Sequence, residues 1–380
     1  MAEQAKVPAI RFAGFTDPWE QRKLIMVAPL QRGFDLPAEK IIPGVYPVMM
    51  SNGIGAYHNE YKVKGPGVVT GRSGTIGNLQ YVESAFWPHN TTLWVTKFYG
   101  NHPKFIYYLY EKIDLKRYKA GSGVPTLNRN DVHDTMVFFP ASRKEQELIS
   151  AVLTYLDDLI TLHQRKYDKL VIFKKSMLEK MFPKDGESVP EIRFAGFTDP
   201  WEQRKLGDVA SSFDYGLNAA ATEYDGQNKY LRITDIDDET HEFSKSDLTT
   251  PLADLAMSAD YLLKEGDLLF ARTGASVGKT YLYRQFDGMV YFAGFLIRAR
   301  IGEGADPEFA YQATLTDAYK KYVAITSQRS GQPGVNAQEY ADYQLMLPSK
   351  TEQQQIGMTL RSLDDLITLH QRKLELLQNI

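Results

Sequence analysis

The sequence has no cysteine, no long apolar run and little net charge. Without cysteine the chain has no disulfide, no thiolate zinc site and no cysteine nucleophile. No apolar run approaches the roughly 18 residues that cross a bilayer, and the N-terminus lacks the apolar core of a signal peptide, so a cytoplasmic location is predicted. A net charge of −3 indicates neither nucleic acid nor membrane as a partner, so any DNA contact must come from local patches.

What the sequence does contain is typical of a folded chain. Hydrophobic residues make up 43% and charged residues 24%, a balance that argues against wholesale disorder. A length of 380 residues leaves room for two domains of ordinary size.

An internal repeat is the main organising feature. The segment IRFAGFTDPWEQRKL at 10–24 recurs letter for letter at 192–206, and LDDLITLHQRK at 156–166 recurs at 363–373. Weaker matches between them keep the same order: RSG at 72–74 with RTG at 272–274, and 123–128 with 331–336. The period of about 200 residues indicates a tandem duplication, because solenoids repeat at roughly 20–50 residues.

Each copy ends in a segment with a heptad pattern. Ser142-x-x-Glu145 and Ser349-x-x-Glu352 predict capping boxes at two helix starts. Behind them, seam positions follow spacings of three and four. The seam consists of Ile149, Leu153, Leu156, Ile160, His163, Ile356, Leu360, Leu363, Ile367 and His370.

The first of these helices is predicted to be unusually long. Only Lys174 interrupts its seam before Pro183 and Gly186 end it. At 1.5 Å per residue, about 40 residues would reach roughly 60 Å, which a compact module cannot bury. The two helices are therefore expected to form an antiparallel pair around a pseudo-twofold axis. The second is expected to be shorter, because the sequence stops at Ile380.

The modules before each helix carry signals of both strands and helices. Strands are predicted at 45–50, 68–69, 93–96, 230–233, 267–271 and 292–301, and helices near 103–119 and 307–323. The repeated Asp17-Pro18-Trp19-Glu20 predicts a further helix start, with Phe15, Trp19, Phe197 and Trp201 as anchors between module and helix. The predicted fold class is α+β, with strand order left open. The predicted parts are a domain at 1–141, a helix at 142–183, a linker and second domain at 184–348, and a helix at 349–380.

The search for catalytic chemistry finds no complete site. Gly274 to Thr280 resembles a phosphate-binding P-loop but has one residue too few before Gly-Lys-Thr, and the other copy has no lysine there. No methyltransferase motif is present, and the histidines do not group at metal-ligand spacings. The chain is therefore predicted to be non-catalytic, with no metal and no cofactor of its own.

With these repeats the chain resembles the specificity subunit of a type I restriction-modification enzyme. The resemblance covers the whole sequence and rests on the FTDPWEQRKL openings, the Arg-Ser/Thr-Gly segments, the Gly-x-Pro-x-Leu/Val-Asn segments and the Pro…Glu-Gln helix starts. It implies two target recognition domains that read a split, asymmetric DNA sequence, held apart by the paired helices. It also implies partners: methyltransferase subunits, two in the usual complex, with S-adenosylmethionine, and motor-nuclease subunits with ATP and magnesium. The family's closing segment is fuller than the residues after 373 provide.

Candidate DNA contacts are polar or basic residues in glycine-rich loops, where backbone can approach phosphate and side chains can reach bases. In the first module they are Ser51, Asn52, Tyr57, Lys62, Arg72, Ser73, Ser122 and Asn128; in the second, Arg232, Thr234, Arg272, Thr273, Lys279, Gln328, Arg329, Ser330 and Gln332. Arg72 and Arg272 recur in both copies, which leaves open whether they hold a turn or phosphate or read a base. The non-repeated Asn52, Gln328 and Arg329 are better candidates for base choice.

The charges of the two modules differ. Residues 25–140 carry 12 basic and 8 acidic side chains (+4), and residues 207–348 carry 12 and 21 (−9). The acids of the second module face away from DNA, face a partner, or accept from cytosine amino groups, and the sequence does not choose among these. Two other functions stay open: an interaction scaffold without DNA specificity, and a stand-alone DNA-modifying enzyme with an unrecognised site.

Overall fold

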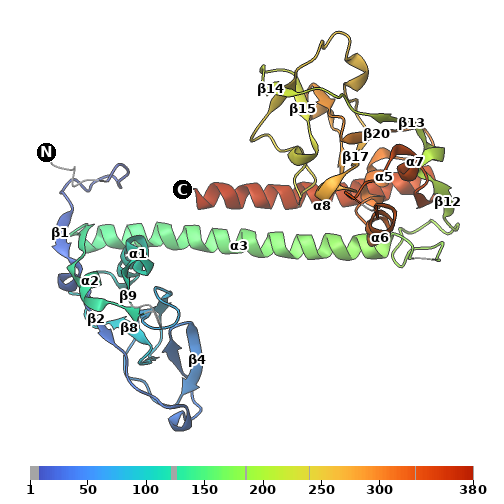
Figure 1. The fold of residues 1–380 in the computed structure, drawn as a ribbon. Coiled ribbons are helices and arrows are strands. Elements are labelled where there is room, and N and C mark those ends of the chain that lie inside the picture. The colour runs from blue at the N-terminus through green and yellow to red at the C-terminus, as the bar shows by residue number, and fades with distance from the viewer. Residues whose placement is uncertain (1–7, 121–125, 185, 239, 330, 380) are drawn as a thin grey trace. The chain divides into compact units, whose positions relative to one another are not determined.

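The chain forms two compact units, Met1–Leu159 and Ile160–Ile380 (Figure 1). The computed structural model describes residues 8–120, 126–184, 186–238, 240–329 and 331–379. Each unit has its own hydrophobic core, and the boundary between them falls inside the 39-residue helix α3 (Arg143–Met181). Within the described residues, no helix is long and apolar enough to cross a membrane.

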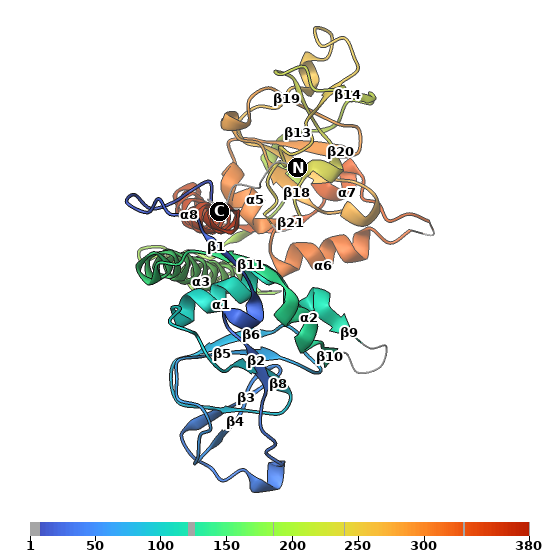
Figure 2. The ribbon, with the colours of Figure 1, turned by 90° about the vertical axis from the view of Figure 1, so that its left-hand side faces the viewer.

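The first unit is built on a four-stranded antiparallel sheet in the order β2-β8-β5-β6. Its strands are β2 (Leu30–Arg32), β5 (Gly67–Gly71), β6 (Leu79–Val82) and β8 (Thr92–Val95). Helix α1 (Pro103–Ile113) lies along this sheet (Figure 2) and buries Phe105, Ile106 and Leu109 in the unit's core. The β-branched and aromatic runs of the sequence thus form the sheet, and the apolar face of α1 covers it.

Smaller elements complete the first unit. The strands are β1 (Glu20–Lys23), β3 (Tyr46–Met50), β4 (Gly53–His58), β7 (Trp87–Pro88), β9 (Lys119–Ala120), β10 (Thr126–Leu127) and β11 (Met136–Phe139). The remaining helices are α2 (Arg129–Asp134) and three short 3-10 helices at Leu24–Met26, Ala38–Lys40 and Leu115–Tyr118.

The second unit has a sheet of the same plan, in the order β13-β20-β17-β18. Its strands are β13 (Ala210–Tyr215), β17 (Asp267–Ala271), β18 (Thr280–Leu282) and β20 (Leu296–Ile301). The other strands are β12 (Glu202–Lys205), β14 (Ala221–Glu223), β15 (Lys229–Leu231), β16 (Thr249–Pro251), β19 (Val290–Phe292) and β21 (Gln344–Leu347).

The helices of the second unit include a long C-terminal one, α8 (Lys350–Gln378). The shorter α-helices are α4 (Leu206–Val209), α5 (Pro307–Ala313), α6 (Asp317–Thr326) and α7 (Ala337–Ala341). The 3-10 helices are Ile233–Asp235, Ala259–Tyr261, Gly274–Ser276 and Gln285–Asp287.

The two units repeat one topology, which confirms the predicted duplication and the α+β class. Besides the four-stranded sheet, each has a parallel strand pair, β3 with β7 and β15 with β19. Each also pairs the end of its repeated opening segment with the strand that leads into a long helix. Glu20 lies opposite Phe139, and Glu202 lies opposite Leu347.

Within the second unit, α8 runs antiparallel to the C-terminal half of α3, as predicted. His163 meets His370, and eleven residues further along α3 Lys174 pairs with Asp364, which lies six residues earlier in α8. Lys174 thus joins the helices through an ion pair at the position where it interrupts the apolar seam.

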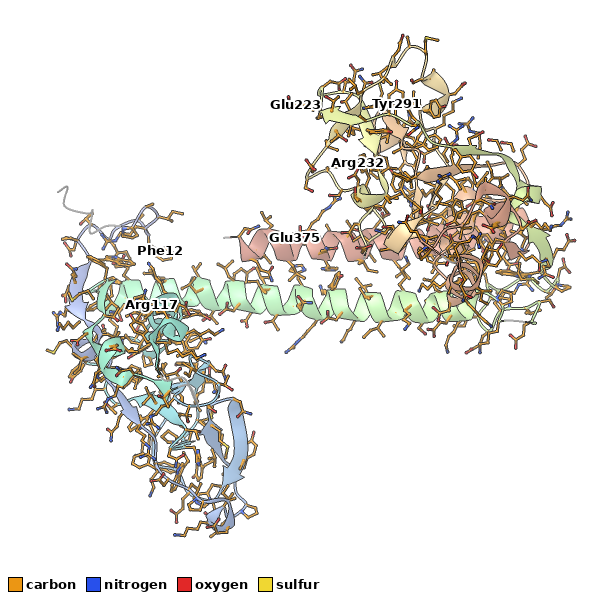
Figure 3. The ribbon with its side chains drawn as sticks, viewed as in Figure 1. Phe12, Arg117, Glu223, Arg232, Tyr291 and Glu375 are labelled. Atoms are coloured by element: carbon orange, nitrogen blue, oxygen red, sulfur yellow. The ribbon has the colours of Figure 1, made fainter. Side chains whose placement is uncertain are left out.

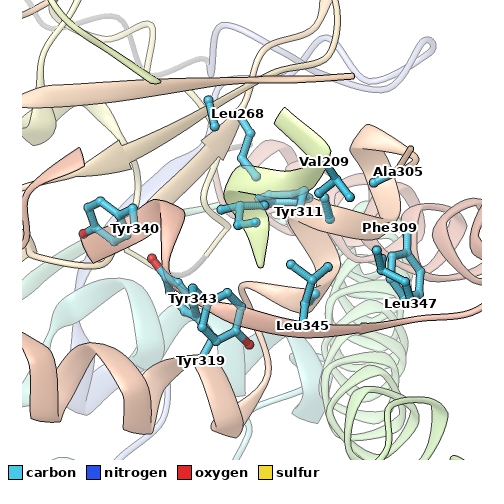
Figure 4. Packing of buried hydrophobic residues seen from close by; sticks show 14 of the residues in the cluster. Val209, Leu268, Ala305, Phe309, Tyr311, Tyr319, Tyr340, Tyr343, Leu345 and Leu347 are labelled. Carbon is cyan, nitrogen blue, oxygen red and sulfur yellow. The ribbon is translucent and has the colours of Figure 1, made fainter. Parts of the chain in front are cut away.

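The core of the second unit reaches the helix pair. Met181 of α3 and Ile356 and Leu360 of α8 belong to one buried cluster with Phe309 and Leu347. Figure 4 labels Phe309 and Leu347 within this cluster. The seam residues Leu363 and Ile367 are half-buried on the same helix. The C-terminal end of α3 and the N-terminal part of α8 are therefore packed into the core of this unit.

The predicted helix start at Asp17 to Glu20 is wrong. In both copies a strand begins directly after the tryptophan, and Glu20–Lys23 pairs with Met136–Phe139. The strand that enters α3 offers these backbone groups partners, and this outweighs the local helix signal. Of the proposed anchors, Trp201 is buried against Phe182 and Phe309, and Trp19 donates through Nε1 to Glu145 of α3 (3.3 Å). The anchoring roles of Phe15 and Phe197 stay a prediction.

The predicted capping boxes form only by half. Ser142 and Ser349 accept hydrogen bonds from the backbone N–H groups of Glu145 and Glu352, each at 3.4 Å. The two glutamate side chains bind arginines instead of returning a bond to the serine backbone.

Two predicted elements are interrupted. The run 292–301 is divided between β19 and β20 around Gly294, and the helix predicted at 307–323 is divided into α5 and α6. After the break between α5 and α6, the side chain of Thr316 caps α6 by accepting a hydrogen bond from the backbone N–H of Tyr319.

Candidate nucleic-acid interface

An arginine-glycine turn joins β5 to β6 in the first unit. Gly74 and Gly77 have φ of +80° and +72°, a left-handed conformation that favours glycine. The backbone of Arg72 holds the turn in place: its N–H donates to the carbonyl of Thr91 (2.8 Å) and its carbonyl accepts from the N–H of Leu127 (2.8 Å). The turn is thereby fixed to two other segments of the unit.

The same turn joins β17 to β18 in the second unit. Gly274 and Gly278 have φ of +71° and +83°. The N–H of Arg272 donates to Phe295 (3.0 Å), and its carbonyl accepts from Val335 (2.9 Å). Since a P-loop leads from a strand into a helix, and this segment joins two antiparallel strands, the likeness to a P-loop has no structural basis.

The two turn arginines differ in their charge partners from most other arginines of the chain. Among the residues that the structure describes, neither Arg72 nor Arg272 is paired with a carboxylate. Most other arginines of the second domain are paired. These pairs are Arg232 with Asp235, Arg284 with Glu308, Arg298 with Asp214, Arg300 with Asp267 and Arg329 with Glu339. The repeated position thus keeps a guanidinium available for an anionic ligand such as phosphate.

Some candidates of the first unit gather around its turn. Ser51 lies in the tight turn between β3 and β4, where its carbonyl accepts from Nδ2 of Asn78 (3.2 Å). The backbone of Ser73 forms an isolated antiparallel β-bridge with Thr126. Asn52 is exposed at the tip of the β3–β4 turn. Ser51, Asn52, Arg72 and Ser73 therefore belong to one group of loops.

The other candidates of the first unit have separate settings. Tyr57 is 52% exposed near the end of β4, and the Lys62 ammonium lies 4.6 Å from the centre of the Trp87 ring. The side chain of Asn128 caps α2 by accepting from the N–H of Asn130. Ser122 lies outside the described residues.

In the second unit, four candidates surround the turn. Thr273 donates through Oγ1 to the carbonyl of Pro333 (3.4 Å), and the amide of Gln332 lies against Gly274. Gln328 and Arg329 are exposed on the segment that leads to this contact, and Arg329 binds Glu339 and the carbonyl of Thr326. Ser330 lies outside the described residues.

Two candidates of the second unit, Arg232 and Thr234, lie in the segment after β15, and a third, Lys279, lies directly before β18. Arg232, labelled in Figure 3, forms two hydrogen bonds of 2.8 and 2.7 Å with the carboxylate of Asp235, and Thr234 is exposed beside it. Lys279 is 12% exposed and binds the carbonyl of Ile236 and the carboxylate of Asp238. Arg232 and Lys279 are thus engaged inside the domain, and their contact with DNA stays a prediction.

Much of the acid excess of the second module has an internal role. Burial alone would raise the pKa of Asp214, but hydrogen bonds from Arg298 and Ser212 lower it below its usual value. Asp237 accepts from the N–H of Thr240 (2.7 Å), and burial raises the pKa of Glu242. These carboxylates hold loops and arginines of the domain, an outcome the sequence did not suggest.

A histidine pair marks the helix seam of the second unit. The Nδ1 atoms of His163 and His370 lie 2.8 Å apart, close enough for one to donate to the other. Burial lowers the pKa of His370, and the charges of His163, Lys166 and Lys373 lower it further. The pair sits at the same position of the two identical LDDLITLHQRK segments, as expected where a twofold axis passes between two helices.

The remaining seam candidates lie on α3 at and before the boundary between the two units. Ile149 packs against that unit's core, and Leu153 and Leu156 are half-buried; Ile160, at the start of the second unit, is also half-buried. Within the described ranges, no three His, Asp or Glu side chains converge as they would around a metal ion.

The sequence reasoning missed two buried ion pairs. Arg11 binds Glu145 through two hydrogen bonds of 2.7 and 2.8 Å, and Arg193 binds Glu352 in the same way at 2.6 and 2.7 Å. The exact repetition of both arginines and both glutamates was the signal that could have revealed them. Each pair fixes the repeated opening segment to the first turn of a long helix.

Comparison with known proteins places these features in a family. A family model described as type I restriction modification DNA specificity domain matches residues 16–171 and 198–379. The MjaVIII type I restriction enzyme specificity subunit of Methanocaldococcus jannaschii is 23% identical over 279 residues, which are 69% of this chain and 63% of that protein. The chain thus spans less than two thirds of this curated relative.

A solved structure shares the fold. The type I restriction-modification S subunit of M. genitalium superposes with a TM-score of 0.64 at 14% identity, over 99% of this chain and 96% of that one. The match extends over both units and supports the fold assignment.

Proposed function

The chain belongs to the family of type I restriction-modification specificity subunits, and we propose that it recognises a bipartite, asymmetric DNA sequence, one half with each unit. The observation that carries this proposal is the repeated arginine-glycine turn. Arg72 and Arg272 occupy the same place in two copies of one fold, while the loops around them differ in sequence. A shared phosphate-binding framework with unlike neighbours suits two readers of different bases.

Two linked readers are favoured by the energetics of DNA recognition. Each correct base pair contributes on the order of 1–3 kcal/mol of discrimination, so one small domain achieves limited specificity. Joining a second domain makes its binding intramolecular and raises its effective concentration. The helix α3, continuous through both units, is suited to fix the separation of the half-sites.

In this proposal other subunits perform the chemistry. Methyltransferase subunits, two in number, would bring S-adenosylmethionine, and motor-nuclease subunits would bring ATP and magnesium. This chain would contribute recognition and docking and no catalytic residue. The lack of a recognisable catalytic motif in the sequence and the family match support this division.

A footprint tests the function. The chain is co-purified with candidate methyltransferase subunits, and protected and methylated bases are mapped on random duplex DNA. We expect two protected segments separated by a fixed gap, and at least a tenfold loss of affinity when one base pair is inserted in the gap. Binding without sequence preference, with the methyltransferase present, would instead support the interaction scaffold. Binding of S-adenosylmethionine by the isolated chain would support a stand-alone enzyme.

Arg329 offers a residue-level test. Arg329→Ala should weaken binding to the cognate half-site by about 1–3 kcal/mol and leave binding to unrelated DNA nearly unchanged. Glu339→Gln is the matched control, because it removes the charged partner of Arg329 and keeps the arginine. An equal loss on both DNAs would make Arg329 a phosphate contact.

A further inference from the structure

Tyr215, the last residue of β13, lies directly beside the turn arginine of the second unit. The guanidinium carbon of Arg272 is 5.0 Å from the centre of the Tyr215 ring, within the distance of about 6 Å at which a cation is attracted to an aromatic face. The Tyr215 hydroxyl accepts a hydrogen bond from the N–H of Ala337 at 3.2 Å. The ring is therefore held at one end by β13 and at the other by the start of α7.

This contact leaves the arginine's donors open. A carboxylate partner would occupy the N–H groups at the edge of the guanidinium, as Asp235 does for Arg232. An aromatic face supports the plane of the guanidinium and leaves its five N–H donors free. Tyr215 thus restrains Arg272 without using the groups that bind phosphate or a base edge.

The corresponding position in the first unit carries a different side chain. Tyr215 lies opposite Ile297, which lies opposite Phe270, the second residue before Arg272. In the first unit Arg32 lies opposite Leu93, which lies opposite Thr70, the second residue before Arg72. The strand register therefore makes Arg32 the counterpart of Tyr215.

Arg32 is engaged in its own ion pair with Asp35, at 3.1 Å. One framework position thus carries an aromatic ring beside one shared arginine and a paired cation in the other copy. The two units thus differ at this strand position, which is Tyr215 on β13 and Arg32 on β2, although both keep the turn arginine.

We propose that Tyr215 is a positioning residue that orients Arg272 for contact with DNA in the second half-site. The proposal rests on the function proposed above. Tyr215 acts through Arg272: it lowers the conformational freedom that the long side chain loses on binding.

The test is a double-mutant cycle on the full chain with the duplex that the footprint defines. Arg272→Ala should weaken binding about fivefold or more and reduce the slope of log K against log salt by about 0.9, as for one lost phosphate contact. Tyr215→Leu should weaken binding roughly two- to fivefold without changing that slope, because the arginine remains. Tyr215→Phe keeps the ring and should stay within about twofold of the parent. The double variant Tyr215→Leu/Arg272→Ala should bind no more weakly than Arg272→Ala alone.

The outcomes separate this inference from the function on which it rests. If Arg272→Ala weakens binding but Tyr215→Leu does not, or if the two losses add, Tyr215 does not act through Arg272. If Arg272→Ala has no effect while the split footprint persists, the positioning role fails and the recognition function stands. If the parent chain shows no sequence preference, the function itself fails. Thermal unfolding of each variant confirms that binding is measured on folded protein.

Discussion

Replacing Glu352 with glutamine should destabilise the second unit more than any surface change. The Glu352 side chain is fully buried and binds Arg193, whose side chain is 11% exposed. The substitution keeps the size and one acceptor oxygen but removes the charge. The guanidinium of Arg193 is then left in a buried place without a counter-charge, and its Nη1 already has no partner.

The magnitude follows from that burial. Breaking a buried pair by removing one partner costs roughly 3–5 kcal/mol, and the small remaining exposure of Arg193 argues for the lower end, about 3 kcal/mol. For a unit of about 200 residues, 1 kcal/mol shifts the melting temperature by roughly 2–4 °C, so a decrease of roughly 6–12 °C is expected.

The assay should report on each unit by itself, because a chain of two units does not unfold in one step. Hydrogen exchange followed by mass spectrometry resolves peptides of the opening segment (192–206) and of the first turn of α8. Protection should fall in both and stay unchanged in β2 to β8 of the first unit. The double variant Arg193→Met/Glu352→Met is the control, since it removes both charges and should recover much of the loss.

A melting temperature of Glu352→Gln within about 1 °C of the parent would refute this reasoning. So would a double variant as unstable as the single one. In the first case the pair would contribute little, and the opening segment would be held by the burial of Trp201 and the β12–β21 pairing. In the second case the loss would not come from an unpaired buried charge.

Further predictions concern pH and the glycine turn. Stability of the helix pair should be full above about pH 6.5 and decrease as the pH falls below that value, because the lowered pKa of His370 means that the unfolded chain binds the proton more readily. His370→Gln should flatten the change in melting temperature between pH 7.5 and 5.5, and an unchanged slope would exclude the His163–His370 contact as its source. Gly278→Ala should destabilise the second unit by about 1–2 kcal/mol from its left-handed backbone and by roughly 1–3 kcal/mol more from overlap with Val323, whose Cγ1 would lie 2.5 Å from the new Cβ. Gly274→Ala should show the backbone cost alone, since the new Cβ would meet only the movable amide of Gln332 at 3.0 Å; equal denaturation midpoints for the two variants would contradict this.

Local pattern was enough to locate the long helices and several strands. The helix predicted at 142–183 is α3 at Arg143–Met181, and the run 267–271 is β17. Such elements are readable because their signals, a heptad spacing or a β-branched run between turn residues, lie within the element itself. The segment Asp17 to Glu20 failed for the opposite reason, since its conformation depends on a strand more than 100 residues away.

The candidate interface divides in the same way. Repetition pointed to Arg72 and Arg272, and the structure adds that both lie in matching turns. The sequence also proposed Arg232 and Lys279, but could not show that each binds a nearby carboxylate. Tyr215 was not singled out, because nothing in its neighbourhood in the sequence indicates that its ring lies against Arg272, 57 residues later.

The sequence by itself determined that one architecture occurs twice, with a long helix after each copy, because identical segments and heptad spacing are properties of residue order. Tertiary structure decided which charges neutralise each other inside the domains and which guanidinium groups stay available. Those outcomes depend on contacts between residues 134 and 159 positions apart, such as Arg11 with Glu145 and Arg193 with Glu352. Pairings of that kind are set when the strands and helices pack, and no local pattern encodes them.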